Sequence, residues 1–469
     1  KNYLDIAAPK LNVAFYDIET DFDLANGGWS EPEDALNQIT AISTYLNWND
    51  MLITQVIAPK GLSPEDAQAI VDQFENTILY TDEKKLLSDW LDIIEDADVL
   101  SGWNSEMYDI PYIVNRIARV ISKAETKRMC LWGDLPKKRT FERYGKEKST
   151  YDLIGRVHLD YMQLYIKYTY IVMHSYSLDA IGEHELNERK VAYDGSLDHL
   201  YNYDFKTFIE YSRQDTALLD KLDRKLKFID LSNTVAHQNT VVISKAMGTV
   251  AVVEQAIINE SHQRGVIAPD KAHHLEEGTK AAGAYVAYPK KGLHSWIGSV
   301  DIKSLYPSIL RSMNASPETI VGQLRQTETL KFLEERMSDK MVKGKKKKGT
   351  SFAGAWEGLF GTLEYEAVIA QRTDVMITID WESSTNHEFS TFGRLTGESK
   401  MPANEVYDLL FGENVNWVLS ANGTIFSLAK EGIIPGILKR WYTERKDLQK
   451  TKGDWKKLEK GIKIPDRLL

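Results

Sequence analysis

The sequence feature that most constrains the fold is the stretch 299–308, which reads SVDIKSLYPS. The apolar residues Trp296, Ile297 and Val300 predict a buried strand that delivers the carboxylate of Asp301 at its end. In α/β and α+β enzymes, a carboxylate in this position commonly binds a hard cation such as Mg²⁺. The approach to Asp301 therefore predicts an enzyme site at the end of a strand.

A turn and a helix follow this strand. Lys303 and Ser304 turn the chain, and a helix is expected from Leu305 with Pro307 in its first turn, where a missing N–H costs nothing. The N–H groups of such a turn can bind phosphate. An Asp that only caps the helix is the alternative, and for an isolated D-x-x-S pattern it is the commoner one.

Composition limits the class of protein. With 469 residues, of which 43% are hydrophobic and 27% charged, the chain is expected to form roughly two to four globular domains. No apolar run approaches the roughly 18 residues of a membrane-spanning helix, and no signal peptide begins the chain, so no membrane partner is expected. The one cysteine, Cys130, excludes an internal disulfide and fits a reducing cytoplasm. The net charge of −10 decides little, because acidic enzymes can still carry basic grooves.

Two acidic residues near the N-terminus share one predicted strand. Residues 11–20 form an apolar run that contains Asp17 and Glu19, and residues 38–46 predict the next antiparallel strand. Side chains two positions apart on a strand point to the same face, so both carboxylates reach one site. Such close charges repel unless cations neutralise them. For D-x-E alone, two solvent-facing acids on an edge strand are the commoner alternative.

Further acidic residues begin or line predicted helices. An amphipathic helix is expected over 84–97, followed by a short strand and turn over 99–104. Asp109 then begins a helix that continues through Arg119, where capping is its alternative role. A helix over 209–219 places two further polar side chains four residues apart on one face, namely Tyr211 and Asp215.

The motifs D-x-E, N-x₃-Y-D and Y-x₃-D, in this order and spacing, resemble those of proofreading 3′–5′ exonucleases with an RNase H-like fold. The resemblance implies that two Mg²⁺ ions, with Mn²⁺ as a substitute, lie about 4 Å apart on four carboxylates. These are Asp17, Glu19, Asp109 and Asp215. One ion would activate a water and the other would stabilise the leaving 3′-oxygen, while Tyr211 would orient the water and Asn104 would contact DNA.

The stretch at Asp301 continues into NASPET at 314–319, and together they resemble the first palm motif of family B DNA polymerases of the T4-like phage branch. The resemblance implies that Asp301 and the Ile302 carbonyl bind the catalytic metals. The backbone at Ser304 and Leu305 would cradle the incoming triphosphate, and Tyr306 would exclude a 2′-OH. The sequence GAYV at 283–286 resembles a template-contacting motif of the same family, which implies DNA contacts from Gly283 and Tyr285.

The end of the chain resembles the start of a polymerase fingers helix. Residues 433–438 and 441–446 carry this likeness, and Arg445 would hold the triphosphate through its planar guanidinium. One turn later, where the family usually has a basic residue, the chain has Gln449 with Lys450 beside it. A second phosphate contact from Lys450 is therefore the expectation.

The sequence predicts an α/β and α+β multidomain protein with an RNase H-like exonuclease domain, a partial palm and the start of the fingers. A polar hairpin tip is expected at 144–151. Residues 335–415 exceed the phage pattern; strands are expected at 375–379 and 416–419, and the five lysines of 343–348 predict a solvated loop rather than a phosphate contact. The predicted division is exonuclease 1–225, helical connector 226–280, palm 281–334, insertion and palm–fingers connection 335–430, and fingers 431–469.

Two polymerase motifs are absent from the sequence: a fingers Lys followed by Asn-Ser-x-Tyr-Gly, and a palm Asp-Thr-Asp. Asp301 alone cannot hold two metals, so the chain is expected to be an exonuclease that polymerises only with a C-terminal piece, in cis or in trans. Both chain ends read as cut, which predicts a fragment or one part of a split protein. The alternatives are a stand-alone exonuclease and a non-catalytic DNA-binding subunit of a split polymerase.

The expected partners follow from the same resemblance. They are a primer–template and a single-stranded 3′ end, dNTP once the palm is complete, and a sliding clamp bound through the missing piece. For a phage-encoded chain, the expected location is the cytoplasm of the host cell.

Overall fold

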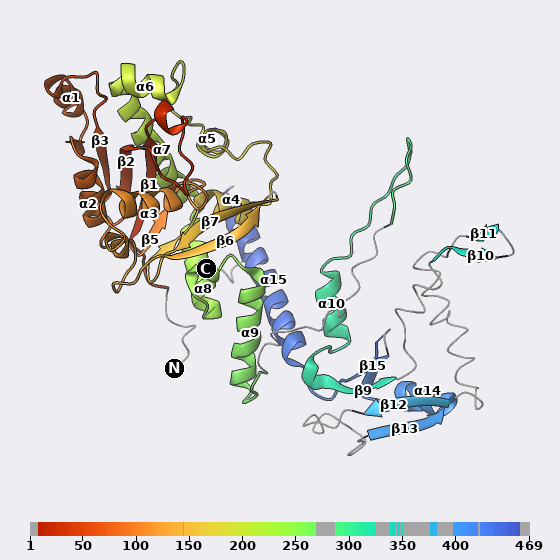
Figure 1. The fold of residues 1–469 in the computed structure, drawn as a ribbon. Helices are drawn as coiled ribbons and strands as arrows, with labels where there is room; N and C mark the ends of the chain where they lie inside the picture. Colours follow the sequence, from red (N-terminus) through yellow and green to blue (C-terminus); the bar gives the residue numbers. More distant parts are fainter. Residues whose placement is uncertain are drawn as a thin grey trace. The chain divides into compact units, whose positions relative to one another are not determined.

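The computed structural model describes residues 8–143, 145–268, 287–324, 338–342, 345–347, 349, 376–381, 397–420 and 423–459 (Figure 1). It separates into two compact units, Lys1–Gln255 and Ala256–Leu469. The five-part division expected from the sequence is finer than this separation and stays a prediction.

The first unit is built on a six-stranded mixed sheet with the strand order β4-β3-β2-β1-β5-β8 (Figure 1). β1, β2 and β3 are antiparallel neighbours, while β4, β5 and β8 add in parallel to β3, β1 and β5. An antiparallel meander extended by parallel strands is the expected RNase H-like arrangement. The strands are β1 Val13–Thr20, β2 Ile39–Leu46, β3 Met51–Ile57, β4 Thr77–Tyr80, β5 Val99–Ser101 and β8 Val157–His158.

Helices pack on both faces of this sheet, because β1 is apolar on both sides. Tyr16 packs with α2 and α3 in one core cluster, while Phe15 packs with α4, α5 and α7 in another. The helices are α1 Pro64–Val71, α2 Glu83–Ile93, α3 Asp109–Val120, α4 Tyr161–Tyr168, α5 Leu178–Leu186, α6 Leu197–Tyr203, α7 Phe205–Leu226 and α8 Phe228–Asn239. α9, Thr249–Gln263, runs across the division between the units. The strands and helices predicted around Asp17, Asp109 and Asp215 are thereby confirmed.

A separate two-stranded hairpin lies between β5 and β8 in the chain. It pairs β6, Lys137–Arg143, with β7, Lys146–Asp152. The prediction of a polar tip over 144–151 was wrong in its extent. Residues 146–151 are part of β7 and pair with β6 as far as Arg143 opposite Lys146, so they belong to the strand and not to the tip.

The second unit contains a five-stranded sheet with the order β13-β12-β9-β15-β14. Its strands are β9 Ile320–Leu324, β12 Met376–Trp381, β13 Gly397–Pro402, β14 Trp417–Leu419 and β15 Thr424–Ser427. α14, Ala403–Phe411, packs on this sheet through Val406 and Leu410, which meet Trp381 and Trp417 in one apolar core. The expected strands at 375–379 and 416–419 are therefore confirmed, and the insertion is partly built into the sheet.

The lysine run was expected to be a loop, and this was wrong for its middle. Lys345–Lys347 forms β11, which pairs antiparallel with β10, Lys340–Val342. Lysine disfavours strands only weakly, and a neighbouring strand satisfies its backbone groups as it does those of other residues.

The buried strand predicted before Asp301 is not present. Residues 296–300 contain no strand, and the side chains of Trp296, Ile297 and Val300 are 101%, 76% and 94% exposed. A strand requires a neighbour to pair its N–H and C=O groups, and no strand of the described residues pairs with this segment. The following turn and helix are confirmed, with α10 spanning Leu305–Ser312; α15, Ile433–Glu459, confirms the last predicted helix.

Candidate active site

A cluster of acidic side chains lies where β1 and α7 meet. Asp17 and Glu19 project from the same face of β1, and α7 packs across this face with Asp215 turned toward them. One carboxylate oxygen from each of Asp17, Glu19 and Asp215 lies within 4.8 Å of the other two. Within the described residues, this is the one group of acidic, histidine or cysteine ligands with a spacing that suits a metal ion.

Hydrogen bonds fix α7 against the sheet on both sides of its acidic residue. The Ser212 hydroxyl lies 2.8 Å from the Ser43 hydroxyl of β2, and the Thr216 hydroxyl donates to the Ser43 carbonyl over 3.3 Å. Ser212 and Thr216 flank Asp215 on the buried side of the helix. The register of α7 on the sheet therefore follows from small polar side chains that sit within its apolar face.

Asp109 approaches the cluster from the first turn of α3, and a neighbouring carboxylate orders the loop before it. Asp160 accepts hydrogen bonds from the backbone N–H of Asn104, over 3.1 Å, and of Glu106, over 3.2 Å. Gly102 is needed at the start of this loop, since a Cβ there would lie 2.8 Å from the Cβ of Ser105. Asp109 is buried outside the group of three, but burial and then the charge of Asp17 raise its pKa, which links it to the cluster.

The cluster holds more negative charge than its surroundings neutralise. Burial, and then the charge of Asp215, raises the pKa of Asp17 to about 7. Burial likewise raises the pKa of Glu19 and of Asp109 well above the usual carboxyl range. Oδ1 of Asp215 is buried and lacks a hydrogen-bond partner. Oxygen ligands with an unsatisfied lone pair are the donor set that Mg²⁺ and Mn²⁺ prefer, so these residues fit a divalent cation.

Lys190 is the functional neighbour that the sequence did not reveal. Its Nζ pairs with Oδ2 of Asp215 and donates a hydrogen bond to the Tyr211 hydroxyl over 3.1 Å. Burial opposes its charge, but the carboxylates of Asp215 and Asp17 still raise the pKa of Lys190. Lys190 lies in the loop between α5 and α6, and a loop lysine is ordinarily solvated, so residue type and spacing carried no signal for it.

Tyr211 lies beside the cluster as the sequence predicted. Its ring packs edge-on against Tyr193, with ring centroids 5.3 Å apart, and Lys190 sits over the ring at 5.1 Å. Burial, and then the charge of Asp215, raises the pKa of Tyr211 far above its usual value. The phenol therefore keeps its proton and can act as a hydrogen-bond donor rather than as a base.

The predicted polymerase residues lie in the second unit and are mostly exposed. Asp301 is exposed in the segment before α10, and among the described residues it belongs to no group of three or more side chains at metal-ligand spacing. Ile302 and Tyr306 are 61% and 67% exposed. Ser304 caps the start of α10 with a left-handed backbone, and Leu305 is the first residue of the helix. Arg445 and Lys450 are exposed on α15. Gly283 and Tyr285 lie outside the described residues.

An RNase H-like sheet that carries a buried acidic centre defines the class of the first unit. The model of the exonuclease domain of DNA polymerase family B matches residues 1–181, and the model of DNA polymerase family B matches residues 240–414. Together these two models cover more than half of the sequence. The chain therefore belongs to the family B DNA polymerases.

The chain is similar to several named polymerases. It is 30% identical over 335 residues to the DNA-directed DNA polymerase of Escherichia phage RB69, which covers 67% of the chain and 36% of that protein. It is 30% identical over 248 residues to that of Enterobacteria phage T4, covering 52% of the chain and 27% of the relative. A DNA polymerase of Pyrococcus glycovorans is 28% identical over 249 residues, covering 51% and 31%. The chain thus spans about a third of the length of these relatives.

The comparisons and the geometry support different parts of the site. The exonuclease-domain match ends at residue 181, before Lys190, Tyr211 and Asp215. The place of Tyr211 and Asp215 beside Asp17 and Glu19 comes from the packing of α7 on the sheet, and Lys190 joins them through its contacts with Asp215 and Tyr211. No helix of the described part is long and apolar enough to cross a membrane.

Proposed function

We propose that this chain is the N-terminal portion of a T4-like family B DNA polymerase and that its first unit removes nucleotides from the 3′ end of DNA. The observation that carries this proposal is the convergence of Asp17, Glu19 and Asp215 within 4.8 Å, from segments far apart in the sequence. The unsatisfied Oδ1 of Asp215 supports the same conclusion, because a buried carboxylate oxygen without a partner is costly unless a cation binds it.

Divalent cations, with Mg²⁺ as the proposed ion, would be held by Asp17, Glu19 and Asp215, with Asp109 as the fourth carboxylate. Bound there, they would supply positive charge that lowers the pKa of the attacking water and stabilises the charge of the leaving oxygen. This charge would also relieve the repulsion that raises the pKa of Asp17.

The protein's own residues orient the reaction. Lys190 donates to the Tyr211 oxygen, so Tyr211 can give its own phenolic hydrogen to another acceptor of the site, either the Asp215 carboxylate or a water molecule. Lys190 also holds Oδ2 of Asp215, which leaves Oδ1 for a cation. Asn104, in the loop that Asp160 orders, is proposed to contact the single-stranded 3′ end.

For the second unit, we propose the polymerase roles that the resemblance implies. Asp301 and the Ile302 carbonyl would bind metal, and the backbone of Ser304 and Leu305 would cradle the triphosphate of dNTP. The other proposed contacts are Tyr306 with the sugar, Arg445 and Lys450 with phosphate, and Gly283 and Tyr285 with template. Nucleotide addition would require a C-terminal piece, in cis or in trans, which would also bind a sliding clamp. The proposed place of action is the host cytoplasm.

The decisive experiment is one assay on the purified chain with end-labelled single-stranded DNA and Mg²⁺. Wild type is expected to shorten the DNA from its 3′ end, and Asp17→Ala to lose this activity by about 10³-fold or more, because it removes a metal ligand. Asp301→Asn in the second unit is the matched control and should degrade DNA at the wild-type rate.

Two outcomes would contradict the proposal. Full degradation by Asp17→Ala would remove the nuclease assignment and favour a non-catalytic DNA-binding subunit. Extension of a primer–template by this chain alone, with dNTPs added, would show that polymerisation does not depend on a second piece.

A further inference from the structure

The segment directly after α10 holds the start of α15. Asn314 is buried, and its backbone is left-handed, with a φ of 50°. Its side-chain oxygen accepts a hydrogen bond from the N–H of Gly432 over 2.8 Å. Its amide nitrogen donates to the carbonyls of Ser427, over 2.7 Å, and Lys430, over 2.8 Å. One side chain thus ties the end of α10 to the whole connection between β15 and α15.

Two further side chains of this segment accept the first N–H groups of α15. A carboxylate oxygen of Glu318 accepts from Ile433, and the Ser316 hydroxyl accepts from Ile434 over 3.3 Å. The Ser316 hydroxyl also donates to the other carboxylate oxygen of Glu318 over 2.8 Å. The negative charge of Glu318 at the positive end of the helix dipole adds to this attachment.

The first turn of α15 has no unsatisfied donor as a result. The free N–H groups at a helix start are normally capped by a residue immediately before it. Here the acceptors come from residues more than a hundred positions earlier, Pro435 has no N–H, and Gly436 donates to the Gly432 carbonyl over 3.0 Å. Gly432 permits the close approach, because a Cβ there would lie 2.8 Å from the Cβ of Ser316.

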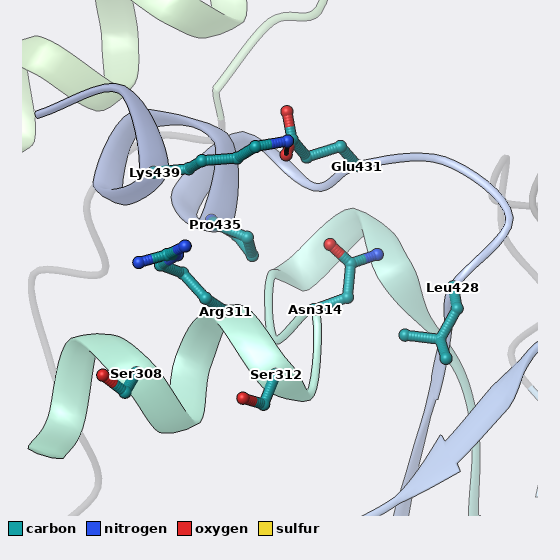
Figure 2. Close-up of a pocket in the computed structure, with 8 residues that line it drawn as sticks. All are labelled: Ser308, Arg311, Ser312, Asn314, Leu428, Glu431, Pro435 and Lys439. Atoms are coloured by element: carbon teal, nitrogen blue, oxygen red, sulfur yellow. Dashed lines mark hydrogen bonds and ion pairs between the residues drawn. The ribbon is translucent and has the colours of Figure 1, made fainter. Parts of the chain in front are cut away.

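Packing at this point is incomplete on one side. Ile433 and Ile437 are buried, but a pocket of about 530 Å³ lies between α10 and the start of α15. Figure 2 shows Ser308, Arg311 and Ser312 of α10 on one side of it, with Pro435 and Lys439 of α15 on the other. Because side chains do not fill this space, packing alone does not fix the angle of α15. The hydrogen bonds from Asn314, Ser316 and Glu318 therefore contribute much to holding the helix in its present orientation.

We infer that Asn314, Ser316 and Glu318 form a clamp that positions α15 and thereby places Arg445 for the nucleotide. This inference rests on the nucleotide-binding role proposed for Arg445. Arg445 follows Ile433 by about 18 Å of helix, so a tilt of about 10° at the first turn moves it by about 3 Å. Binding geometry tolerates only about 0.5 Å of error. Asp301 lies just before α10 and the clamp directly after it, so α10 links the proposed metal ligand to the helix that is proposed to hold phosphate.

The test measures the orientation of α15 directly in the full chain. Spin labels are attached to cysteines that replace Glu405 on α14 and Leu448 on α15, both of which are exposed. Cys130, the only native cysteine, is buried and should not take up the label. Pulsed electron paramagnetic resonance then gives the distribution of distances between the two labels.

Wild type is expected to give one narrow distance. Glu318→Ala and Asn314→Ala should each broaden the distribution at least twofold, while Glu318→Gln, which keeps the acceptor for Ile433, should restore the narrow one. Glu413→Ala, an exposed acid without a role in the clamp, is the matched control and should leave the distribution unchanged. Exonuclease activity, which belongs to the first unit, should stay at the wild-type rate in all of them and reports that the first unit is intact. Folding of the second unit is checked in each variant by circular dichroism and a melting curve.

An unchanged distance distribution in both alanine variants would overturn the clamp. If Asn314→Ala fails to fold, the pair Glu318→Ala and Glu318→Gln decides alone, because only loss of the acceptor should broaden the distribution. The label distances do not depend on catalysis. If the proposed exonuclease activity is absent, the label distances can still be measured and still test the clamp. If Arg445 does not bind nucleotide, the clamp would still hold α15 but would not serve nucleotide binding.

Discussion

Lys190 balances the charge of the carboxylate cluster at the scale of single residues. It reaches Asp215 and Tyr211 at once, and it is half-buried beside carboxylates whose burial raises their pKa. The Lys190 ammonium thus neutralises part of the repulsion among the carboxylates. Bound metal ions would neutralise the rest. Removing this cation should disturb both the orientation of Tyr211 and the affinity of the site.

We therefore expect Lys190→Gln to slow exonucleolytic cleavage by about 10²-fold, a loss typical for a group that positions a reactant. The measurement is the initial rate on single-stranded DNA at saturating Mg²⁺. Lys221→Gln, which breaks the surface pair with Glu188, is the control and should keep the wild-type rate. Equal rates for the two variants would mean that Lys190 has no part in the site.

The raised pKa of Asp17 predicts how stability depends on pH and metal. Its pKa is about 7 when folded, against 3.8 for an ordinary Asp, so the folded state holds the proton more tightly. The resulting stabilisation is fully present below about pH 4 and is lost as pH rises through about 7; the part lost between pH 5.5 and pH 8 amounts to about 2 kcal/mol. In EDTA, the melting temperature should therefore be lower at pH 8 than at pH 5.5.

Mg²⁺ should reverse this loss, since its ligands must be deprotonated. The expected rise in melting temperature on adding Mg²⁺ is larger at pH 8 than at pH 5.5. Asp17→Asn should be more stable than wild type in EDTA at pH 8 and should gain less from Mg²⁺. An equal gain at both pH values in wild type would contradict the assignment of the cluster as a cation site.

At the scale of elements, a buried ion pair fixes the helix that begins with Asp109. Glu83 at the start of α2 accepts from Nε of Arg116 on α3 over 2.8 Å and from the N–H of Ile39 on β2 over 2.8 Å. Arg116 also donates to the carbonyls of Ala35, over 3.1 Å, and Leu36, over 2.8 Å. α2, α3 and β2 therefore share one polar network under the sheet.

Arg116→Met should lower the free energy of unfolding of the first unit by about 3–5 kcal/mol, because it leaves the Glu83 carboxylate buried and unpaired. This change is measured by urea unfolding, with the loss of exonuclease activity as the signal that reports unfolding of the first unit. Arg119→Met, on the exposed side of the same helix, should cost less than about 0.5 kcal/mol. Adding Glu83→Gln to Arg116→Met, which removes the unpaired charge but keeps an acceptor for the Ile39 N–H, should recover much of the loss. A double variant as unstable as the single one would refute the argument.

Several elements followed from local pattern alone. Alternation placed Asp17 and Glu19 on one face of a strand, and a four-residue spacing placed Tyr211 and Asp215 on one face of a helix. The strand expected before Asp301 failed for the opposite reason. Its apolar residues satisfied the pattern, but a strand also needs a partner, and the pattern carries no information about one.

At the scale of the whole molecule, every described residue of the carboxylate cluster lies in the first unit. The unit has its own sheet and its own apolar cores, which is what independent folding requires. The second unit contains Asp301, Arg445 and the clamp, and none of these residues contributes to the cluster.

A fragment of residues 1–248, which ends before α9, should therefore keep the exonuclease activity of the full chain within about threefold. The comparison uses equal concentrations of both proteins on single-stranded DNA, where the second unit is not required for the chemistry. The same fragment with Asp17→Ala serves as the inactive control. A folded fragment without activity would show that the site needs residues from beyond α8.

The sequence by itself determined which chemical groups the protein has and on which elements they lie, because strand alternation and helix spacing are local properties. It also indicated the polymerase family, through the motifs that contain Asp17, Asp109, Asp215 and Asp301. Only the tertiary structure decided that Lys190 joins Asp215, and that Asn314 meets Gly432 across 118 positions. Those contacts depend on how distant segments pack, and the residues that make them follow no periodicity from which the packing could be inferred.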